Sequence, residues 1–278
     1  MPGDRTKQSA IDTFERAAAS YDRVGVDYFQ VFGARLVEAA ALRPGQRVLD
    51  LGSGRGAVLF PAARAIGPTG YAVGIDAAPT MVALTSVDAT ALGLTQVEVR
   101  LGDADEPPGT PGEYDAVLAG LVLFFLPDVS VAVHRYATLL KPGGLLAFSW
   151  FGPDDARWTP VFTALDRYLP HPPDRTAPPD PTDVWRDPES IRTMLIAAGY
   201  VDIETVEETF EVTVPDVETW WNWSFSHGGR DYFEGFPVDR HAEIKAAAAA
   251  AMGEVRRPDG SLSVRPVLRF TTARTPSS

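Results

Sequence analysis

Short continuous runs of apolar residues alternate with stretches of helical periodicity up to about residue 150 of the chain. The continuous runs predict strands that are buried on both faces of a sheet, and they cover residues 47–51, 71–75, 97–101, 114–119 and 145–150. Between them, apolar residues three and four positions apart predict helices over residues 57–65, 79–92 and 129–140. Strands that alternate with helices in this way are typical of a parallel sheet covered by helices on both faces.

The two ends of the chain depart from this regular pattern. Helical spacing predicts two helices, over residues 10–19 and 27–41, before the first strand. Closely spaced prolines between Pro170 and Pro181 exclude a helix or a central strand and predict a long loop. After this loop, the pattern predicts helices over 188–198, 217–226 and 239–252, and strands over 200–206, 209–214 and 262–271.

Composition narrows the class of protein. The chain has 278 residues, of which 45% are hydrophobic and 22% charged, as in ordinary globular proteins. Its net charge of -12 argues against a nucleic-acid partner, and it has no basic cluster or apolar run suited to a membrane. Cysteine is absent and no other ligand set is evident, so we expect no metal. The start lacks the apolar segment of a signal peptide, so we expect a cytoplasmic protein.

A glycine-rich turn follows the first predicted strand. Gly52, Ser53 and Gly54 join this strand to a helix, and glycines at such a place allow a ligand to approach the backbone closely. Together with Ala57, the two glycines also satisfy the spacing of a dinucleotide-binding turn. Taken alone, the segment has a turn that binds no ligand as its alternative interpretation.

Three acidic residues at strand ends narrow the choice of ligand. Asp50, Asp76 and Asp103 lie at the ends of the first three strands, whose carboxyl ends converge on one crevice of a parallel sheet. A carboxylate at Asp50 would repel the diphosphate of a dinucleotide. S-adenosylmethionine carries an ammonium, a sulfonium, ribose hydroxyls and an adenine amine but no phosphate, so it suits an acidic crevice.

These motifs resemble those of the class I S-adenosylmethionine-dependent methyltransferases, in particular the small-molecule enzymes of the quinone and natural-product groups of the actinobacterial kind. The matching segments are Val48-Leu-Asp-Leu-Gly-Ser-Gly-Arg-Gly56, Val73-Gly-Ile-Asp76, Gly102-Asp103-Ala104 and Leu139-Leu-Lys-Pro-Gly-Gly144. The resemblance implies a Rossmann-like α/β fold with a seven-stranded, mostly parallel sheet. Its antiparallel last strand is expected over residues 262–271.

The resemblance also implies how the cofactor is held. Asp50 would face the methionine ammonium, Asp76 would bind the ribose, and Asp103 would take the adenine amine. The full set of implied cofactor-binding residues is Tyr21, Asp50, Gly52, Ser53, Gly54, Asp76, Met81, Asp103, Ala104 and Leu121.

A domain organisation follows from the same resemblance. Residues 1–42 are expected to form an N-terminal helical lid, and residues 43–278 the methyltransferase domain. The domain contains a proline-rich loop over 151–187 and a helical substrate cap over 215–256, inserted before the last strand. Tyr21 matches a lid tyrosine that covers the cofactor in such enzymes, although a surface helix end is its alternative interpretation.

An aromatic helix provides the candidate acceptor site. All 6 tryptophans lie at or after Trp150. At helical spacing, Trp220, Trp223 and His227 share one face of the predicted helix. Pockets for small ligands are mostly apolar, so we predict that this face binds the substrate, with burial in the core as the alternative.

Two polar residues complete the predicted site. His227 is the only one of the four histidines next to the candidate pocket, where it could act as the base, or it could interact with the helix dipole. Arg230 could bind an anionic group of the substrate or pair with a surface carboxylate.

Together these features favour an enzyme that methylates a small apolar or aromatic metabolite in secondary metabolism. One alternative is methylation of a prenyl or terpenoid alkene carbon, through a carbocation stabilised by the aromatic side chains. A nicotinamide-dependent oxidoreductase and a non-catalytic cofactor-binding scaffold are alternatives of other classes.

Overall fold

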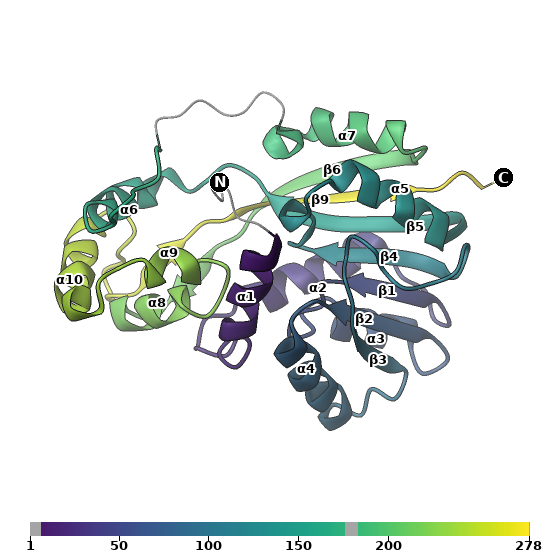
Figure 1. Cartoon of the computed structure of the whole chain (residues 1–278), viewed down its shortest axis with the longest axis horizontal. Helices are drawn as coiled ribbons and strands as arrows, with labels where there is room; N and C mark the ends of the chain where they lie inside the picture. Colours follow the sequence, from purple (N-terminus) through teal and green to yellow (C-terminus); the bar gives the residue numbers. More distant parts are fainter. Residues whose placement is uncertain (1–6, 176–182, 278) are drawn as a thin grey trace. The chain divides into compact units, whose positions relative to one another are not determined.

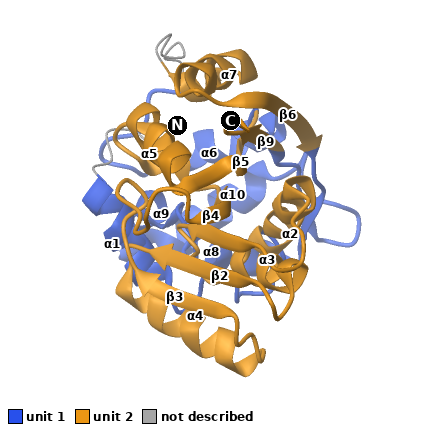
Figure 2. Cartoon of the chain, turned by 90° about the vertical axis from the view of Figure 1, so that its right-hand side faces the viewer, with its two compact units in different colours: residues 1–28, 153–178, 209–267 blue, residues 29–152, 179–208, 268–278 orange. Residues whose placement is uncertain are grey.

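The chain forms two compact units, each assembled from separate stretches of the sequence (Figure 2). The sheet unit comprises residues 29–152, 179–208 and 268–278, and the helical unit comprises residues 1–28, 153–178 and 209–267. The computed structural model describes residues 7–175 and 183–277.

The sheet unit contains a seven-stranded sheet with the strand order β3-β2-β1-β4-β5-β9-β6 (Figure 1). Strands β1 to β5 pair in parallel, and β9 runs antiparallel to β5. This topology confirms the predicted fold, including its reversed strand. The strands of this sheet are β1 (Arg47–Leu51), β2 (Tyr71–Asp76), β3 (Val97–Leu101), β4 (Tyr114–Gly120), β5 (Leu140–Phe151), β6 (Val201–Thr209) and β9 (Val267–Arg274).

The predicted last strand over 262–271 is wrong in its extent, because the chain divides there into strands of two different sheets. β8 (Leu262–Val264) pairs with β7 (Val212–Val214) in a two-stranded sheet of the helical unit. Between β8 and β9, the amide of Arg265 donates to Asp155 at 3.0 Å, and Pro266 has no amide hydrogen to give to a ladder. The reversed strand of the large sheet is therefore β9.

Strand β5 begins earlier than predicted. It includes residues 141–144, which lie between the predicted helix over 129–140 and the predicted strand over 145–150. The amide of Gly143 donates to the carbonyl of Pro276, and the amide of Thr275 donates to the carbonyl of Gly144, each at 3.0 Å. These bonds to the C-terminal segment hold residues 143 and 144 in line with the strand.

Helices cover the sheet, and the five longer ones agree with the predicted helices apart from small shifts at their ends. Two of them begin at aspartate caps, since Asp128 accepts from the amide of Val131 and Asp187 accepts from the amide of Ser190. The helices of the sheet unit are α2 (Phe29–Ala40), α3 (Leu59–Ile66), α4 (Pro79–Ala91), α5 (Val129–Leu139) and α7 (Pro188–Ala197), with the 3-10 turns η1 (Leu123–Phe125) and η3 (Val184–Arg186).

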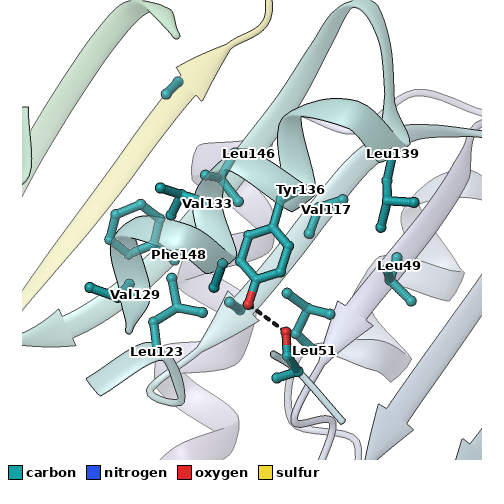
Figure 3. Close-up of a cluster of buried hydrophobic side chains, with 14 of the residues drawn as sticks. Leu49, Leu51, Val117, Leu123, Val129, Val133, Tyr136, Leu139, Leu146 and Phe148 are labelled. Atoms are coloured by element: carbon teal, nitrogen blue, oxygen red, sulfur yellow. Dashed lines mark hydrogen bonds between the residues drawn. The ribbon is translucent and has the colours of Figure 1, made fainter. Parts of the chain in front are cut away.

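One face of the sheet packs against α5, as Figure 3 shows. Val133 and Tyr136 of α5 are completely buried in a cluster with Val117 of β4 and Phe148 of β5. The hydroxyl of Tyr136 donates to the carbonyl of Ala104, beyond β3, at 2.7 Å. This hydrogen bond attaches the segment that follows β3 to the core.

The opposite face packs against α2 and α3. A Cβ on Gly120 of β4 would point at Val58, just before α3, and towards Leu36 of α2. Helix α2 therefore belongs to the sheet unit. The predicted lid, residues 1–42, is divided between the two units at residue 28.

The helical unit contains helices that the sequence patterns revealed only in part. Helix α6 lies inside the segment 151–187, which was predicted to be a proline-rich loop, so this prediction was wrong for its first half. Residues 176–182 of that loop, and residues 1–6 of the predicted lid, lie outside the described residues. The helices of the unit are α1 (Lys7–Ala17), α6 (Thr159–Asp166), α8 (Val217–Ser224), α9 (Arg230–Glu234) and α10 (His241–Ala251), with the 3-10 turns η2 (Ala156–Trp158) and η4 (Val238–Arg240).

Ion pairs fasten α1 to α9 within this unit. The guanidinium of Arg16 donates to Asp231 at 3.0 Å and to Glu234 at 2.8 Å. Thr13 also donates to Asp231. The first helix of the chain is thus connected to residues more than two hundred positions later. None of the described helices has the length and apolarity needed to cross a membrane.

Replacing Tyr136 with Phe should lower the free energy of unfolding by about 1–2 kcal/mol, because the buried carbonyl of Ala104 loses its donor. Chemical denaturation would measure this loss. The matched control is Tyr168→Phe, whose hydroxyl makes a longer bond of 3.3 Å to exposed Glu243 and whose loss should cost much less. Equal stabilities of the two variants would contradict a structural role for the Tyr136 hydroxyl.

Candidate active site

The turn after β1 lies at the carboxyl edge of the sheet. Gly52 and Gly54 have positive φ angles of 61° and 48°, a region that glycine enters without steric cost. A Cβ on Gly52 would lie 2.5 Å from Cγ2 of Val122, which follows β4. Both the backbone conformation and the available space therefore require glycine at position 52.

Asp76 holds this turn from the neighbouring strand. Its Oδ2 accepts from the amide of Gly54 at 2.8 Å, and its Oδ1 accepts from the amide of Ala78, just before α4, at 2.9 Å. Thr85 of α4 donates to the carbonyl of Gly54 at 2.6 Å. Since each carboxylate oxygen has two lone pairs, Asp76 can hold the turn and still accept from a ligand hydroxyl.

Asp50, in β1, is a buried carboxylate with a relative exposure of 1%. Neither of its oxygens has a hydrogen-bond partner within residues 7–175 and 183–277. Burial raises the pKa of Asp50 well above its usual range, and the charge of Asp76 adds to this effect. The amide of Leu59, at the start of α3, partly offsets the rise without reaching the geometry of a hydrogen bond.

A second buried polar atom belongs to Ser53, three residues after Asp50. The hydroxyl of Ser53, in a residue 5% exposed, also has no hydrogen-bond partner in the described part of the chain. Buried polar groups are normally paired, so two such groups around one turn are suited to bind a polar ligand. An ammonium would satisfy Asp50, and therefore the methionine end of S-adenosylmethionine fits this turn.

The segment after β3 supplies the next predicted residues. The amide of Gly102 donates to the carbonyl of Asp76 at 3.0 Å, so this segment starts beside the end of β2. Asp103 accepts from the amide of Asp105 at 2.9 Å, which closes a tight turn around buried Ala104. Asp103 and Ala104 thus follow directly after the residue that is bonded to Asp76.

Leu121 marks the end of β4, and its backbone is unusual. Its φ of 53° lies in the left-handed region, which is strained for a residue with a Cβ and often occurs at functional sites. Its amide donates to the carbonyl and the hydroxyl of Ser149 on β5, each at 3.2 Å. Ser149 was not predicted as a site residue, although it is a single hydroxyl within the otherwise apolar strand expected over 145–150.

The sheet unit therefore gathers most of the predicted cofactor residues at the ends of four strands. Met81, in the first turn of α4, is also buried there, with a relative exposure of 1%. The residues that the structure brings together are Asp50, Gly52, Ser53, Gly54, Asp76, Met81, Asp103, Ala104 and Leu121. Tyr21 belongs to the helical unit, where its ring contacts Phe14 at a centroid distance of 6.1 Å, and its role at the cofactor stays a prediction.

The tryptophans of the aromatic helix α8 lie in two different environments of the helical unit. Trp220 stacks on Trp158 at 5.6 Å between ring centroids, and Trp221 packs against Phe233 at 5.4 Å. Both tryptophans are buried by the aromatic side chains of their own unit. For Trp220, this packing supports the alternative interpretation of the predicted face, which is burial in a core.

Trp223 belongs to a different group, which we call the Trp223 cluster: Tyr28, Trp223 and His227. The ring of Trp223 lies 5.0 Å from that of Tyr28 and 4.6 Å from that of His227. Trp223 is 7% exposed, and its indole Nε1 has no hydrogen-bond partner among the described residues. Tyr28 was not predicted as a site residue, because it lay at the start of a helix expected to be part of the lid.

The electrostatics of His227 differ from those of an ordinary base. Burial lowers its pKa to about 4, so its ring is neutral at physiological pH. The amide of Gly229 donates to its Nδ1 at 3.0 Å. A Cβ on Gly229 would lie 2.9 Å from Cε1 of the ring, so glycine permits this close approach.

Arg230, the last of the predicted substrate residues, has protein partners. Its Nε donates to Glu234 at 2.6 Å, and its Nη1 donates to the carbonyls of Arg16 and Phe225 at 3.0 and 3.2 Å. These bonds connect α9 with α1 and with the end of α8. Within the described residues, no three His, Asp or Glu side chains gather as a metal site would require.

The strand order, the glycine turn and the three strand-end acids define a class of enzyme. A family model described as a methyltransferase domain matches residues 48–144, which include the glycine turn and all three strand-end acids. The chain belongs to the class I S-adenosylmethionine-dependent methyltransferases, as the resemblance implied, and S-adenosylmethionine is its cofactor.

Particular relatives extend the match beyond this domain. The chain is 36% identical over 245 residues to the nocamycin O-methyltransferase of Saccharothrix syringae. This match covers 84% of this chain and 87% of that relative. It is 39% identical over 164 residues to the aklanonic acid methyltransferase DauC of Streptomyces sp. strain C5, over 59% of this chain and 70% of the relative. The comparisons favour methyl transfer over a nicotinamide-dependent oxidoreductase.

Solved structures share the fold. The SpnF cyclase superposes with a TM-score of 0.60 at 22% identity and covers 99% of this chain and 98% of its own. The YcgJ protein of Bacillus subtilis gives a TM-score of 0.59 at 19% identity, over 89% of this chain and 99% of its own.

Replacing Asp50 with Asn should separate the stability of the protein from its affinity for the cofactor. Folding raises the pKa of the Asp50 carboxyl, so the folded state loses stability as the pH rises above the ordinary pKa of an aspartate. The Asn variant has no such carboxyl and should be at least as stable as the parent at neutral pH. Binding of S-adenosylhomocysteine should weaken about tenfold or more, because a hydrogen bond to a charged group contributes roughly 1.5–3 kcal/mol.

Urea denaturation and calorimetry on the same sample would measure both effects. Asp115→Asn is the matched control, since Asp115 pairs with Lys141 and the amide of Arg47 at the start of β1, away from the glycine turn. If Asp50→Asn bound the ligand as tightly as the parent, Asp50 would not face its ammonium.

Proposed function

We propose that this enzyme transfers the methyl group to an oxygen atom of a small, largely apolar metabolite in a natural-product pathway. The observation that supports this most is the similarity to the nocamycin O-methyltransferase, because it extends over 84% of the chain and so includes much of the helical unit. The acidic composition and the aromatic side chains of α8 agree with an apolar small molecule.

The sheet unit supplies the residues that hold the cofactor. Asp50 would bind the ammonium, Asp76 the ribose hydroxyls, and Asp103 the adenine amine. When bound, S-adenosylmethionine supplies a methyl carbon on a sulfonium, which an oxygen lone pair attacks while the electron pair of the broken carbon–sulfur bond stays on sulfur. The contribution of the protein to such a displacement is to position the acceptor and to exclude water.

The helical unit supplies the proposed acceptor-binding residues. The cap over 215–256 contains Trp220, Trp223, His227 and Arg230, and Tyr28 joins them from the N-terminal segment. The contacts described above favour the Trp223 cluster as the acceptor-binding part, because Trp220 and Arg230 are engaged within the unit itself. Carbon methylation of an alkene, through a cation stabilised by these rings, is the less favoured outcome.

An isotope-label assay would test the proposed reaction. The enzyme would be incubated with S-adenosylmethionine carrying a ¹³C-methyl group and with extracts of metabolite-producing actinobacteria, and products would be examined by mass spectrometry and NMR. We expect a methyl carbon shift typical of an O-methyl group. A C-methyl or N-methyl product would overturn the proposal, and Asp76→Ala should abolish labelling in either case.

Hydrogen exchange would test the proposed lid. We expect amide exchange in residues 10–28 to slow when S-adenosylhomocysteine binds, because lids commonly close on ligand binding. Residues 241–251 of α10 serve as the internal control and should not change. Equal exchange with and without ligand would show that residues 10–28, including Tyr21, only pack within the helical unit.

A further inference from the structure

The imidazole of His227 is held in one neutral tautomer. Its Nδ1 accepts from the amide of Gly229, so this nitrogen carries no proton and its lone pair is engaged. In a neutral imidazole the proton is then on Nε2. His227 therefore has a donor at Nε2 and has no available lone pair with which to take a proton from a substrate.

The indole of Trp223 adds a second donor to the same cluster. Its Nε1–H is buried and has no acceptor within residues 7–175 and 183–277, whereas the buried indole of Trp158 donates to the carbonyl of Ser263 at 3.1 Å. A buried donor without an acceptor costs free energy, and such groups are rare in folded proteins. An oxygen atom of a bound ligand would satisfy it.

We infer that Trp223 donates its indole N–H to an oxygen of the methyl acceptor, and that His227 is a positioning residue that packs on the Trp223 ring and does not act as the base. This inference rests on the proposed O-methyl transfer and names the chemical class of its acceptor. The cluster provides no base, because the Nδ1 lone pair of His227 is engaged and burial raises the pKa of Tyr28, which keeps its hydroxyl protonated. The acceptor oxygen therefore loses its proton to water before it reacts. The acceptor is therefore an acidic hydroxyl, such as that of a carboxylic acid, an enol or a phenol, and not an aliphatic alcohol.

The first test examines the protein itself. Two-bond ¹H–¹⁵N spectra of enzyme labelled with ¹⁵N-histidine and bound to S-adenosylhomocysteine would identify the tautomer of His227. We expect the Nε2–H form at neutral pH, with the signal assigned by its loss in His227→Phe. In the Nδ1–H form, Nε2 would carry an available lone pair. That result would overturn the claim that His227 does not act as the base.

The second test uses 2-naphthoate as an acidic probe and 2-naphthalenemethanol as a neutral alcohol with the same ring system. Titration with 2-naphthoate should shift the Trp223 Nε1–H signal in ¹⁵N-tryptophan-labelled enzyme, and Trp223→Phe should raise its dissociation constant about tenfold. Trp221→Phe is the matched control, since Trp221 packs against Phe225 and Phe236. An unmoved Trp223 signal, or an equal response to the alcohol, would overturn the inference.

A pair of variants separates positioning from proton transfer. His227→Phe keeps an aromatic ring beside Trp223, whereas His227→Ala removes it. With the acceptor identified by the isotope-label assay, we expect the Phe variant to retain kcat within about tenfold and the Ala variant to show a raised KM. A general base contributes about 10²–10⁴-fold, so an equal loss of that size in both variants would assign the base to His227.

The product of the isotope-label assay and the tautomer of His227 test the proposed function and the role of His227 separately. A C-methyl or N-methyl product in the isotope-label assay would reject oxygen as the acceptor atom whatever the spectra show. An O-methyl product together with the Nδ1–H tautomer would keep the proposed function and reject the role given to His227.

Discussion

The carboxylate of Asp76 fixes the geometry on which the whole cofactor site depends. One oxygen accepts from the turn after β1 and the other from the residue before α4, so two chain reversals share one side chain. Two backbone amides at helix approaches would otherwise have to find water or a ligand. The same carboxylate is expected to accept from the ribose, so a single group would set both the backbone of the turn and the position of the cofactor. A substitution at Asp76 would therefore disturb both.

Asp50 illustrates a different relation between structure and function. A buried carboxylate without hydrogen bonds destabilises the folded chain, and the charge of Asp76 increases this cost. Fold stability alone would favour an apolar residue at this position of β1, beside completely buried Leu49 and Leu51. The carboxylate is explained by a cationic ligand, whose binding would supply the missing partner. Cofactor binding should consequently stabilise the sheet unit more than its contact area suggests.

The sequence predicted those parts of the structure that depend on a pattern of neighbouring residues, which is a local pattern. Apolar strands and a glycine turn are local, and they located β1, β2, β4 and the residues around Asp50 and Asp76. The edge strand β3 was expected to be buried on both faces, but its apolar residues alternate with charged ones and none is fully buried. The division of residues 262–274 into two strands was missed, because it depends on a bond from the distant Asp155 to the amide of Arg265. Helix periodicity placed Trp220 and Trp223 on one face, yet it could not show that Trp158, sixty residues earlier, would cover the first of them.

The difference between local patterns and contacts of distant residues also explains why the sequence predicts the cofactor better than the acceptor. The family model matches residues 48–144, all within the sheet unit, so what this family shares is the cofactor-binding turn and its acids. The helical unit comes from three separate stretches outside that match, and contacts such as that of Tyr28 with Trp223 join residues far apart in the sequence. A relative that aligns over 84% of the chain therefore carries more information about the acceptor than the family model does. Changes of acceptor within such a family need alter only the helical unit, since the glycine turn and the three strand-end acids lie outside it.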